Sequence, residues 1–258
     1  SAGSRLWVAL ASDITGRKII AGSGNTYRSS DWGATWVERA STGMQSWYAL
    51  ASDSTCTKIV AAGYGYIHTS SDSGVSWVAS PSAGHRIWYS VASDSTGTQI
   101  AAGVGSNSFH LDPPGYVYTS SDSGATWVER IAAGLAAWHS LALDSAGRTI
   151  VAGTDQGLVV VSSDSGVTWA EKVVWSGNKI RAMACDSTGT KIFAGVSLGY
   201  IYTSSDKFAT RSQSAASRNW YAIASDSSGT KIVAGVGGTP GGFIYFSSDS
   251  GVSWYDYP

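Results

Sequence analysis

Short apolar runs alternate with clusters of Asp, Ser, Thr and Gly along the whole chain. Residues 47–52 read WYALAS, a short apolar run that favours a strand buried on both faces, and residues 66–70 alternate aromatic and polar positions. The turn-forming stretches Asp53–Thr57 and Gly63–Gly65 lie between such runs. No segment shows helical periodicity. The pattern predicts four short strands in this region, over residues 47–52, 58–62, 66–70 and 77–78.

The same pattern recurs six times at a nearly fixed interval. Its clearest element is the octapeptide SSDSGVSW at residues 70–77. Self-similarity at a period of about 20–50 residues is typical of repeat architectures. In the fifth copy Phe208 replaces the Gly and Arg211 the Trp, so we expect a distorted turn there. The Asp of the octapeptide recurs at spacings of 41, 50, 42, 42 and 43 residues, as Asp31, Asp72, Asp122, Asp164, Asp206 and Asp249.

Four strands per copy predict an all-β fold, a six-bladed β-propeller of four-stranded antiparallel blades placed radially so that few strand edges are exposed. No linker or charge block interrupts the copies, which favours a single domain over residues 1–258. First strands should lie around the axis, and the last blade should be completed by its own C-terminal strand. The expected blades cover approximately residues 1–41, 42–82, 83–132, 133–174, 175–214 and 215–258.

The six octapeptide Asp residues have a structural explanation. An Asp at the end of a strand can accept hydrogen bonds from turn N–H groups, and a Gly two residues later adopts a left-handed conformation without steric cost. The Trp then covers the turn with a large apolar face. All six are therefore interpreted as structural residues.

This octapeptide resembles the Asp-box, or BNR repeat, S-x-D-x-G-x-T-W, of sialidases, sortilin-type receptors and photosystem assembly factors. Five of the six copies match it closely, and the resemblance covers nearly the whole chain. The recurring lead-in, Ser-Ala-Gly followed by Trp and Tyr, is similar to that of the tandem Trp-repeat propellers of bacteria. The resemblance implies a propeller but no particular reaction, because the same turn occurs in hydrolases, receptors and scaffolds.

Composition narrows the range of partners. Charged residues make up 14% of the chain and the net charge is −1, with no basic stripe, so nucleic acid is not an expected partner. No apolar run approaches the roughly 18 residues that span a bilayer, so membrane insertion is not expected either. Cys56 and Cys185 occupy non-equivalent positions and are predicted to be free thiols. The Gly- and Ser-rich composition favours an extracellular or periplasmic location without fixing one.

Residues suited to catalysis are scarce. Twelve of the Asp residues belong to the two turns of each copy, the three Glu and Asp256 fall on outer fourth strands, and Asp112 and Asp155 alone lie outside the repeat pattern. Two-carboxylate glycoside hydrolysis needs a convergent pair about 5–10 Å apart, whereas these two belong to different blades. The Arg-Ile-Pro motif of sialidases is missing around Arg28, and the four His lack metal-ligand spacing. We predict no catalytic residues, no metal and no cofactor.

Departures from the repeat indicate where a ligand could bind. The third copy inserts residues 106–114 between its second and third strands, and the sixth enlarges the same loop with residues 237–242. Both loops are expected on the face that carries the interblade connections. An Arg recurs two residues before the lead-in Trp in three copies, where solvated loop arginines or interblade hydrogen bonds are the simpler interpretation. The candidate ligand-binding residues are Arg86, Phe109, His110, Asp112, Trp175, Arg218 and Asn219.

The role of Trp175 and the class of ligand both leave alternatives open. The lead-in Trp becomes Ile180 in the fifth blade, and Trp175 nearby either fills the vacated space or forms an exposed stacking platform. The connecting residues vary from copy to copy, whereas a multivalent lectin should repeat its site. The sequence therefore favours a non-catalytic propeller that acts as a binding or structural interaction module with a protein or glycan ligand. A carbohydrate-binding, lectin-like propeller is the alternative, and a glycoside hydrolase comes third.

Overall fold

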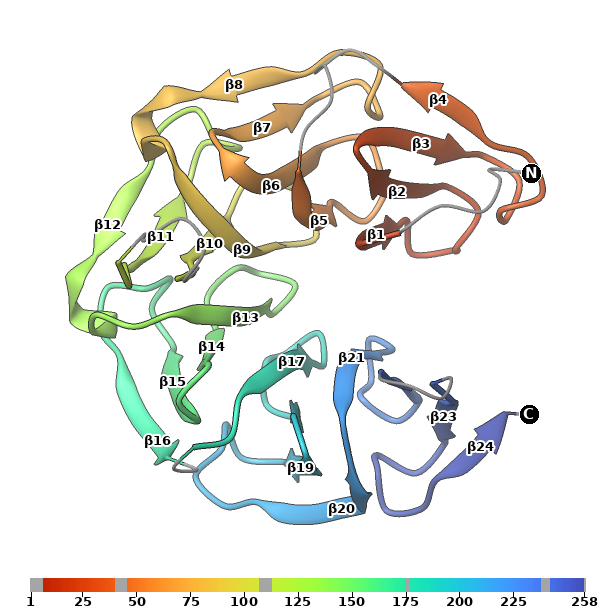
Figure 1. The fold of residues 1–258 in the computed structure, drawn as a ribbon, viewed down its shortest axis with the longest axis vertical. Coiled ribbons are helices and arrows are strands. Elements are labelled where there is room, and N and C mark those ends of the chain that lie inside the picture. Colours follow the sequence, from red (N-terminus) through yellow and green to blue (C-terminus); the bar gives the residue numbers. More distant parts are fainter. Residues whose placement is uncertain (1–6, 40–45, 107–112, 175–176, 238–241, 258) are drawn as a thin grey trace. The chain divides into compact units, whose positions relative to one another are not determined.

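The computed structural model describes residues 7–39, 46–106, 113–174, 177–237 and 242–257. In these ranges the regular secondary structure is almost entirely strand (Figure 1), as predicted, and no helix is long or apolar enough to span a membrane. Two 3₁₀ turns, η1 (Pro81–Ala83) and η2 (Ile131–Ala133), complete the secondary structure. The strands are β1 (Ala9–Ser12), β2 (Ile19–Ser23), β3 (Asn25–Ser29), β4 (Val37–Arg39), β5 (Trp47–Ser52), β6 (Ile59–Gly65), β7 (Ile67–Ser70), β8 (Val78–Ser80), β9 (Arg86–Ser93), β10 (Ile100–Val104), β11 (Val117–Ser120), β12 (Val128–Arg130), β13 (Trp138–Leu143), β14 (Ile150–Thr154), β15 (Leu158–Ser162), β16 (Ala170–Val174), β17 (Ile180–Cys185), β18 (Ile192–Val196), β19 (Gly199–Ser204), β20 (Ser212–Arg218), β21 (Trp220–Ser225), β22 (Ile232–Val236), β23 (Ile244–Ser247) and β24 (Tyr255–Tyr257).

The strands pair as consecutive four-stranded antiparallel meanders, numbered here as repeats 1 to 6. The chain divides into two compact units, Ser1–Ile131 and Ala132–Pro258. The first unit holds β1–β4 as one sheet and β5–β12 as an eight-stranded sheet made of two meanders. The second unit holds the sheets β13–β16, β17–β20 and β21–β24. The last repeat is completed by β24, which pairs with β23 as expected from the sequence. That the chain forms a single domain stays a prediction.

Repeats 2 and 3 share a sheet because β6 is longer than the sequence predicts. The predicted turn at Gly63–Gly65 is wrong: these residues continue the strand, and Tyr64 and Gly65 pair with Ile87 and Arg86 of β9. The Tyr64 N–H also donates to the Ser46 carbonyl at 3.2 Å. A Cβ at Gly63 would lie 1.9 Å from that carbonyl oxygen, so the approach requires glycine. The turn is reduced to the residues around Tyr66.

Within each unit, the first strands of neighbouring repeats pack side by side, β1 against β5 and β5 against β9, and likewise β13, β17 and β21. Trp88, Trp138 and Trp220 lie at or near the start of first strands β9, β13 and β21, and all three are fully buried. Within each unit, the turn after a first strand bonds to the same turn of the next repeat: the Ile14 N–H donates to Ser54 O at 2.9 Å, and the Ser187 N–H to Ser227 O at 2.9 Å. Burial and a repeated backbone bond therefore fix the spacing of repeats.

The turn between the third and fourth strands, here called the Asp turn, has the same hydrogen bonds in every repeat. In repeat 2 the Asp72 carboxylate accepts from the Ser76 N–H at 2.8 Å and from the Ser70 hydroxyl at 2.8 Å. The Ser70 hydroxyl oxygen in turn accepts from the Gly74 N–H at 2.8 Å. Ser73 and Gly74 both have positive φ, 61° and 79°. The turn is therefore closed by side chains within eight residues of each other, without any ligand.

The prediction of a distorted Asp turn in repeat 5 is wrong. The Thr210 N–H donates to Asp206 at 2.8 Å and the Phe208 N–H to the Ser204 hydroxyl at 2.9 Å, as in the other repeats. Phe208 keeps the glycine's positive φ, 62°, and is 1% exposed. It belongs to the same buried cluster as Ile180 and Val161. Repeat 5 lacks both tryptophans, and Phe208 contributes a buried ring to the cluster there, a role that sequence reasoning considered only for Trp175.

Candidate functional site

Each repeat has two ends of different character. The Asp turn lies beside the turn that follows the first strand, since the Ser73 N–H donates to Thr57 O at 2.9 Å. This end is called the Asp-turn face. At the other end, the turn between the second and third strands bonds to the segment that enters the first strand: the Gly105 N–H donates to Ile87 O and the Ser197 N–H to Lys179 O, both at 2.9 Å. This end is called the connection face.

On the Asp-turn face the carboxylates are occupied by hydrogen bonds. Hydrogen bonds from the Ser76 hydroxyl and N–H lower the pKa of Asp72 from 3.8 to about 2. Equivalent bonds from the residue four positions on lower the pKa of Asp31, Asp164 and Asp249 to about 2. In the other turn of repeat 2, the Asp53 carboxylate accepts from the Thr57 N–H at 2.7 Å. The four Asp-turn carboxylates with lowered pKa values are therefore ionised near neutral pH, and like Asp53 they accept hydrogen bonds from their own turns.

Four of the seven predicted ligand-binding residues, Phe109, His110, Asp112 and Trp175, lie outside the described residues. The other three, Arg86, Arg218 and Asn219, are on the connection face. Arg86 begins β9 in the first unit, while Arg218 ends β20 in the second, four residues past the expected blade boundary at 214. The Asn219 amide oxygen accepts from the Ser197 hydroxyl at 2.7 Å. The structure therefore brings Arg218 and Asn219 together and places Arg86 in a separate unit.

Arg86 and Arg218 have the same environment. The guanidinium of Arg86 lies over the Tyr118 ring, 5.2 Å from its centroid, and that of Arg218 lies over Tyr245 at 4.9 Å. Both arginines are exposed, as the interpretation of solvated loop arginines expects, and each also stacks on an aromatic ring of the repeat's own third strand. Burial and the hydrogen bond to Glu129 raise the pKa of Tyr118 to about 12, so the ring beneath Arg86 is a neutral phenol.

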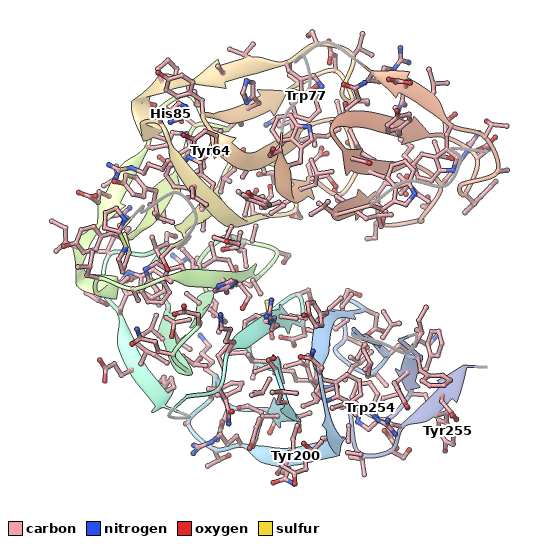
Figure 2. The ribbon with its side chains drawn as sticks, in the orientation of Figure 1. Tyr64, Trp77, His85, Tyr200, Trp254 and Tyr255 are labelled. Atoms are coloured by element: carbon pink, nitrogen blue, oxygen red, sulfur yellow. The ribbon has the colours of Figure 1, made fainter. Side chains whose placement is uncertain are left out.

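A surface aromatic cluster, missed in the sequence, lies next to Arg86. Figure 2 labels Tyr64 and His85 side by side at the end of repeat 2. Their ring centroids are 5.1 Å apart, and Tyr66 lies 5.4 Å from His85 on the other side. Tyr64 and Tyr66 are 43% and 40% exposed. The available signal was the sequence GYGY, which interrupts the repeat where β6 is extended.

A second set of missed residues directly follows the lead-in position of each first strand. Tyr48 and Tyr89 of neighbouring repeats stack with centroids 5.2 Å apart and planes 11° from parallel. In the second unit the guanidinium of Arg181 lies 4.6 Å from the Tyr221 ring centroid. Half-buried His139 occupies the same position in repeat 4, where burial lowers its pKa to about 4 and leaves it neutral near pH 7.

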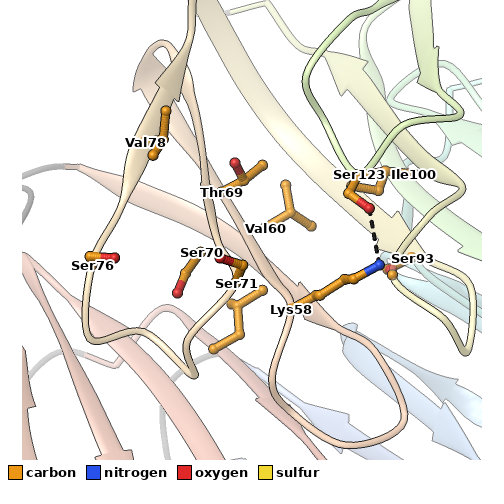
Figure 3. Close-up of a pocket in the computed structure, with 12 residues that line it drawn as sticks. Lys58, Val60, Thr69, Ser70, Ser71, Ser76, Val78, Ser93, Ile100 and Ser123 are labelled. Carbon is orange, nitrogen blue, oxygen red and sulfur yellow. Dashed lines mark hydrogen bonds between the residues drawn. The ribbon is translucent and has the colours of Figure 1, made fainter.

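Two hollows lie away from the aromatic cluster and the arginines described above. A hollow of about 110 Å³ separates repeats 2 and 3 (Figure 3), where the Lys58 ammonium donates to the Ser123 hydroxyl at 3.2 Å. This volume is too small for most organic ligands. An apolar groove of about 540 Å³ on repeat 6 is lined by Phe246 and Tyr255, the latter labelled in Figure 2. Among the described residues, no group of three or more His, Cys, Asp or Glu could hold a metal ion.

Comparison with known proteins identifies the fold class. No protein-family model matches the chain, and no curated protein matches it. Among solved structures, the GH74 xyloglucanase of Xanthomonas campestris superposes with a TM-score of 0.74 and 16% identity, over 99% of this chain and 46% of that one. YCF48 from Cyanidioschyzon merolae superposes with a TM-score of 0.71 and 14% identity, over 100% of this chain and 86% of that one. The Cps50 (Swd1) β-propeller domain of Myceliophteria thermophila superposes with a TM-score of 0.68 and 12% identity, over 96% of this chain and 84% of that one.

These likenesses show that the chain has a β-propeller fold. At such low identity they show the fold alone. The chain spans less than half the length of two of the GH74 enzymes that it matches, 46% of one and 38% of the other. The relatives differ in function: one is a xyloglucanase, and one YCF48 structure contains a bound D1 peptide.

Proposed function

We propose that this protein is a six-bladed, Asp-box propeller that acts as a non-catalytic binding module, and that its connection face holds a segment of a partner protein. The Asp turns have the spacing and hydrogen bonds that the Asp-box resemblance implies. They serve to hold each repeat together, and the variable residues of the opposite face contact the partner. The peptide bound to YCF48 supports a protein segment as the ligand.

One observation carries this proposal: exposed aromatic and cationic side chains gather on the connection face. Tyr64, Tyr66 and His85 form an accessible aromatic cluster, and Arg86 follows it directly. Tyr and Arg are among the residue types that most often carry binding energy at protein interfaces, because Tyr buries a large area with only two side-chain torsions and Arg offers several hydrogen-bond donors. The aromatic cluster and the arginine do not both recur in every repeat, and this favours one asymmetric site over a set of equivalent sugar sites.

Selection of a random dodecapeptide library on the immobilised protein tests the proposal. We expect retained peptides whose affinity, measured by fluorescence anisotropy, falls about tenfold or more in Tyr64→Ala, as at an interface hot spot. Trp32→Ala is the matched control, since Trp32 is an aromatic on the Asp-turn face and is 67% exposed. A failure to retain any peptide above an unrelated protein refutes the proposed function. Affinity that depends on Trp32 but not on Tyr64 shows that the wrong face was chosen.

The absence of catalysis is part of the same proposal. Twelve Asp residues accept hydrogen bonds or occupy equivalent turn positions on the Asp-turn face, so their carboxylates are used to hold their own turns. We expect no turnover of xyloglucan or of a fluorogenic sialoside by the purified protein. Product formation above that of heat-inactivated protein contradicts this expectation.

A further inference from the structure

The charges of the described connection face are unequal. In the second unit, the connecting segments and the first-strand residues beside them carry Lys179, Arg181 and Arg218 but the single carboxylate Asp155. In the first unit, Arg86 lies over Tyr118, whose hydroxyl donates to the carboxylate of Glu129, so a negative charge lies close to this arginine. The turn Asp residues all lie on the opposite face, where hydrogen bonds hold them. The connection face of the second unit is therefore the cationic end of that unit.

Two of these cations are held in place without using their hydrogen-bond donors. Arg181 lies 4.6 Å over the Tyr221 ring and Arg218 lies 4.9 Å over Tyr245. Neither guanidinium donates a hydrogen bond to another described residue, and the buried Nε of Arg181 has no partner. On Arg86, by contrast, Nε donates to the Ala83 carbonyl at 3.4 Å. A stacked guanidinium with free N–H groups is pre-organised for a planar, bidentate anion such as a carboxylate.

The surroundings of Arg181 fit the same class of ligand. Half-buried His139 and exposed Lys179 lie close enough to act on each other electrostatically, and Asp155 is the one opposing charge. Asp155 has a buried carboxylate oxygen without a hydrogen-bond partner. Asp155 therefore does not neutralise Arg181 through a salt bridge, and an incoming carboxylate does not have to displace it.

We infer that the connection face of the second unit binds an acidic protein segment, and that Arg181 and Arg218 are the residues that recognise its Asp or Glu side chains. This inference rests on the proposed function and names the chemistry of the partner. Each arginine offers two parallel N–H···O bonds to one carboxylate, while Tyr221 and Tyr245 keep its plane fixed. Asn219, whose amide nitrogen donates to no described residue, lies beside Arg218 and can donate to the backbone of the segment.

The same peptide selection tests the inference when its products are sequenced. We expect Asp and Glu to be enriched several-fold among retained dodecapeptides, and their affinity to fall as salt is raised. Arg181→Met and Arg218→Met should each weaken binding at least tenfold, because Met keeps the alkyl packing and removes the charge. Arg181→Lys should restore only part of the affinity, since lysine cannot bind a carboxylate bidentately. Arg148→Met is the matched control, an exposed arginine of the same unit on the Asp-turn face.

The outcomes separate the two proposals. Retained peptides without enrichment of acidic residues, or peptides that bind Arg181→Met as tightly as wild type, leave the binding function standing and overturn the acidic class. Equal loss of affinity in Arg148→Met shows a non-specific charge effect and overturns the assignment of the two arginines. Retention of no peptide overturns both proposals. Retention of sulfated or sialylated glycans on an array, lost in Arg181→Met, identifies an anionic sugar in place of a peptide.

Discussion

Replacing Phe208 by glycine, the residue found at this position in the other five repeats, should destabilise the protein. Two opposing effects decide the result. The side chain is 1% exposed in the cluster with Ile180 and Val161, and emptying such a site costs about 3–5 kcal/mol for Phe→Ala. The backbone at 208 has a φ of 62°, a conformation that costs a non-glycine residue about 1–2 kcal/mol and costs glycine nothing. The loss of packing exceeds the relief of strain.

We therefore expect the free energy of unfolding of Phe208→Gly to fall by about 2–3 kcal/mol, which corresponds to a decrease in Tm of roughly 5–10 °C for a chain of this size. Urea unfolding followed by tryptophan fluorescence measures it. Phe208→Ala separates the two effects, because it loses the same ring but keeps the strained Cβ, and should be about 1 kcal/mol less stable than Phe208→Gly. If Phe208→Gly is as stable as wild type, Phe208 does not fill the space left by the two absent tryptophans.

Three further predictions concern the turns and the thiols. Asp72→Ala removes the acceptor of two turn N–H groups and should lower the free energy of unfolding by about 1–2 kcal/mol, with exposed Ser71→Ala as the unaffected control. Because the folded-state pKa values of the Asp-turn carboxyls lie near 2, below the usual 3.8, their stabilisation is complete above about pH 4 and is lost as pH falls toward 2. A Tm that stays constant from pH 4 to pH 2 at fixed ionic strength contradicts this. Burial raises the pKa of the Cys56 thiol, and that of Cys185 to about 12, so neither free thiol should react with a disulfide reagent at pH 8 until the protein is unfolded, when two should be counted.

Most of the fold could be predicted because its determinants are local. The four strands of repeat 2 lie within one or two residues of the predicted ends, apart from the extension of β6. The Asp turn is closed by groups that lie two to four residues apart, so an octapeptide contains all the information needed to form it. Even the degenerate turn of repeat 5 keeps these bonds, since Ser204, Asp206 and Thr210 are all retained.

What the sequence did not reveal depends on contacts between distant residues. Gly63–Gly65 form strand and not turn because they pair with β9. Phe208 is buried because it packs in a cluster that includes residues of the preceding repeat. Arg86 finds its partner Tyr118 on a strand separated from it by the inserted loop. Asp155 was recognised as lying outside the repeat pattern. Arg181 was not, although it departs from the Tyr that three of the six repeats carry one residue beyond the lead-in position.

The residue that follows the lead-in position of each first strand explains how a regular fold can present an asymmetric site. In the first strands of successive repeats it holds Val8, Tyr48, Tyr89, His139, Arg181 and Tyr221. The preceding residue is buried as Trp or Ile in repeats 2 to 6, and the Asp turn at the opposite end of each repeat closes without help from it. Substitution at this position therefore leaves the repeat's own hydrogen bonds intact. Because the connection face is free to vary while the Asp-turn face is not, recognition by this propeller should depend on unlike residues in neighbouring repeats, as in the stack of Arg181 on Tyr221.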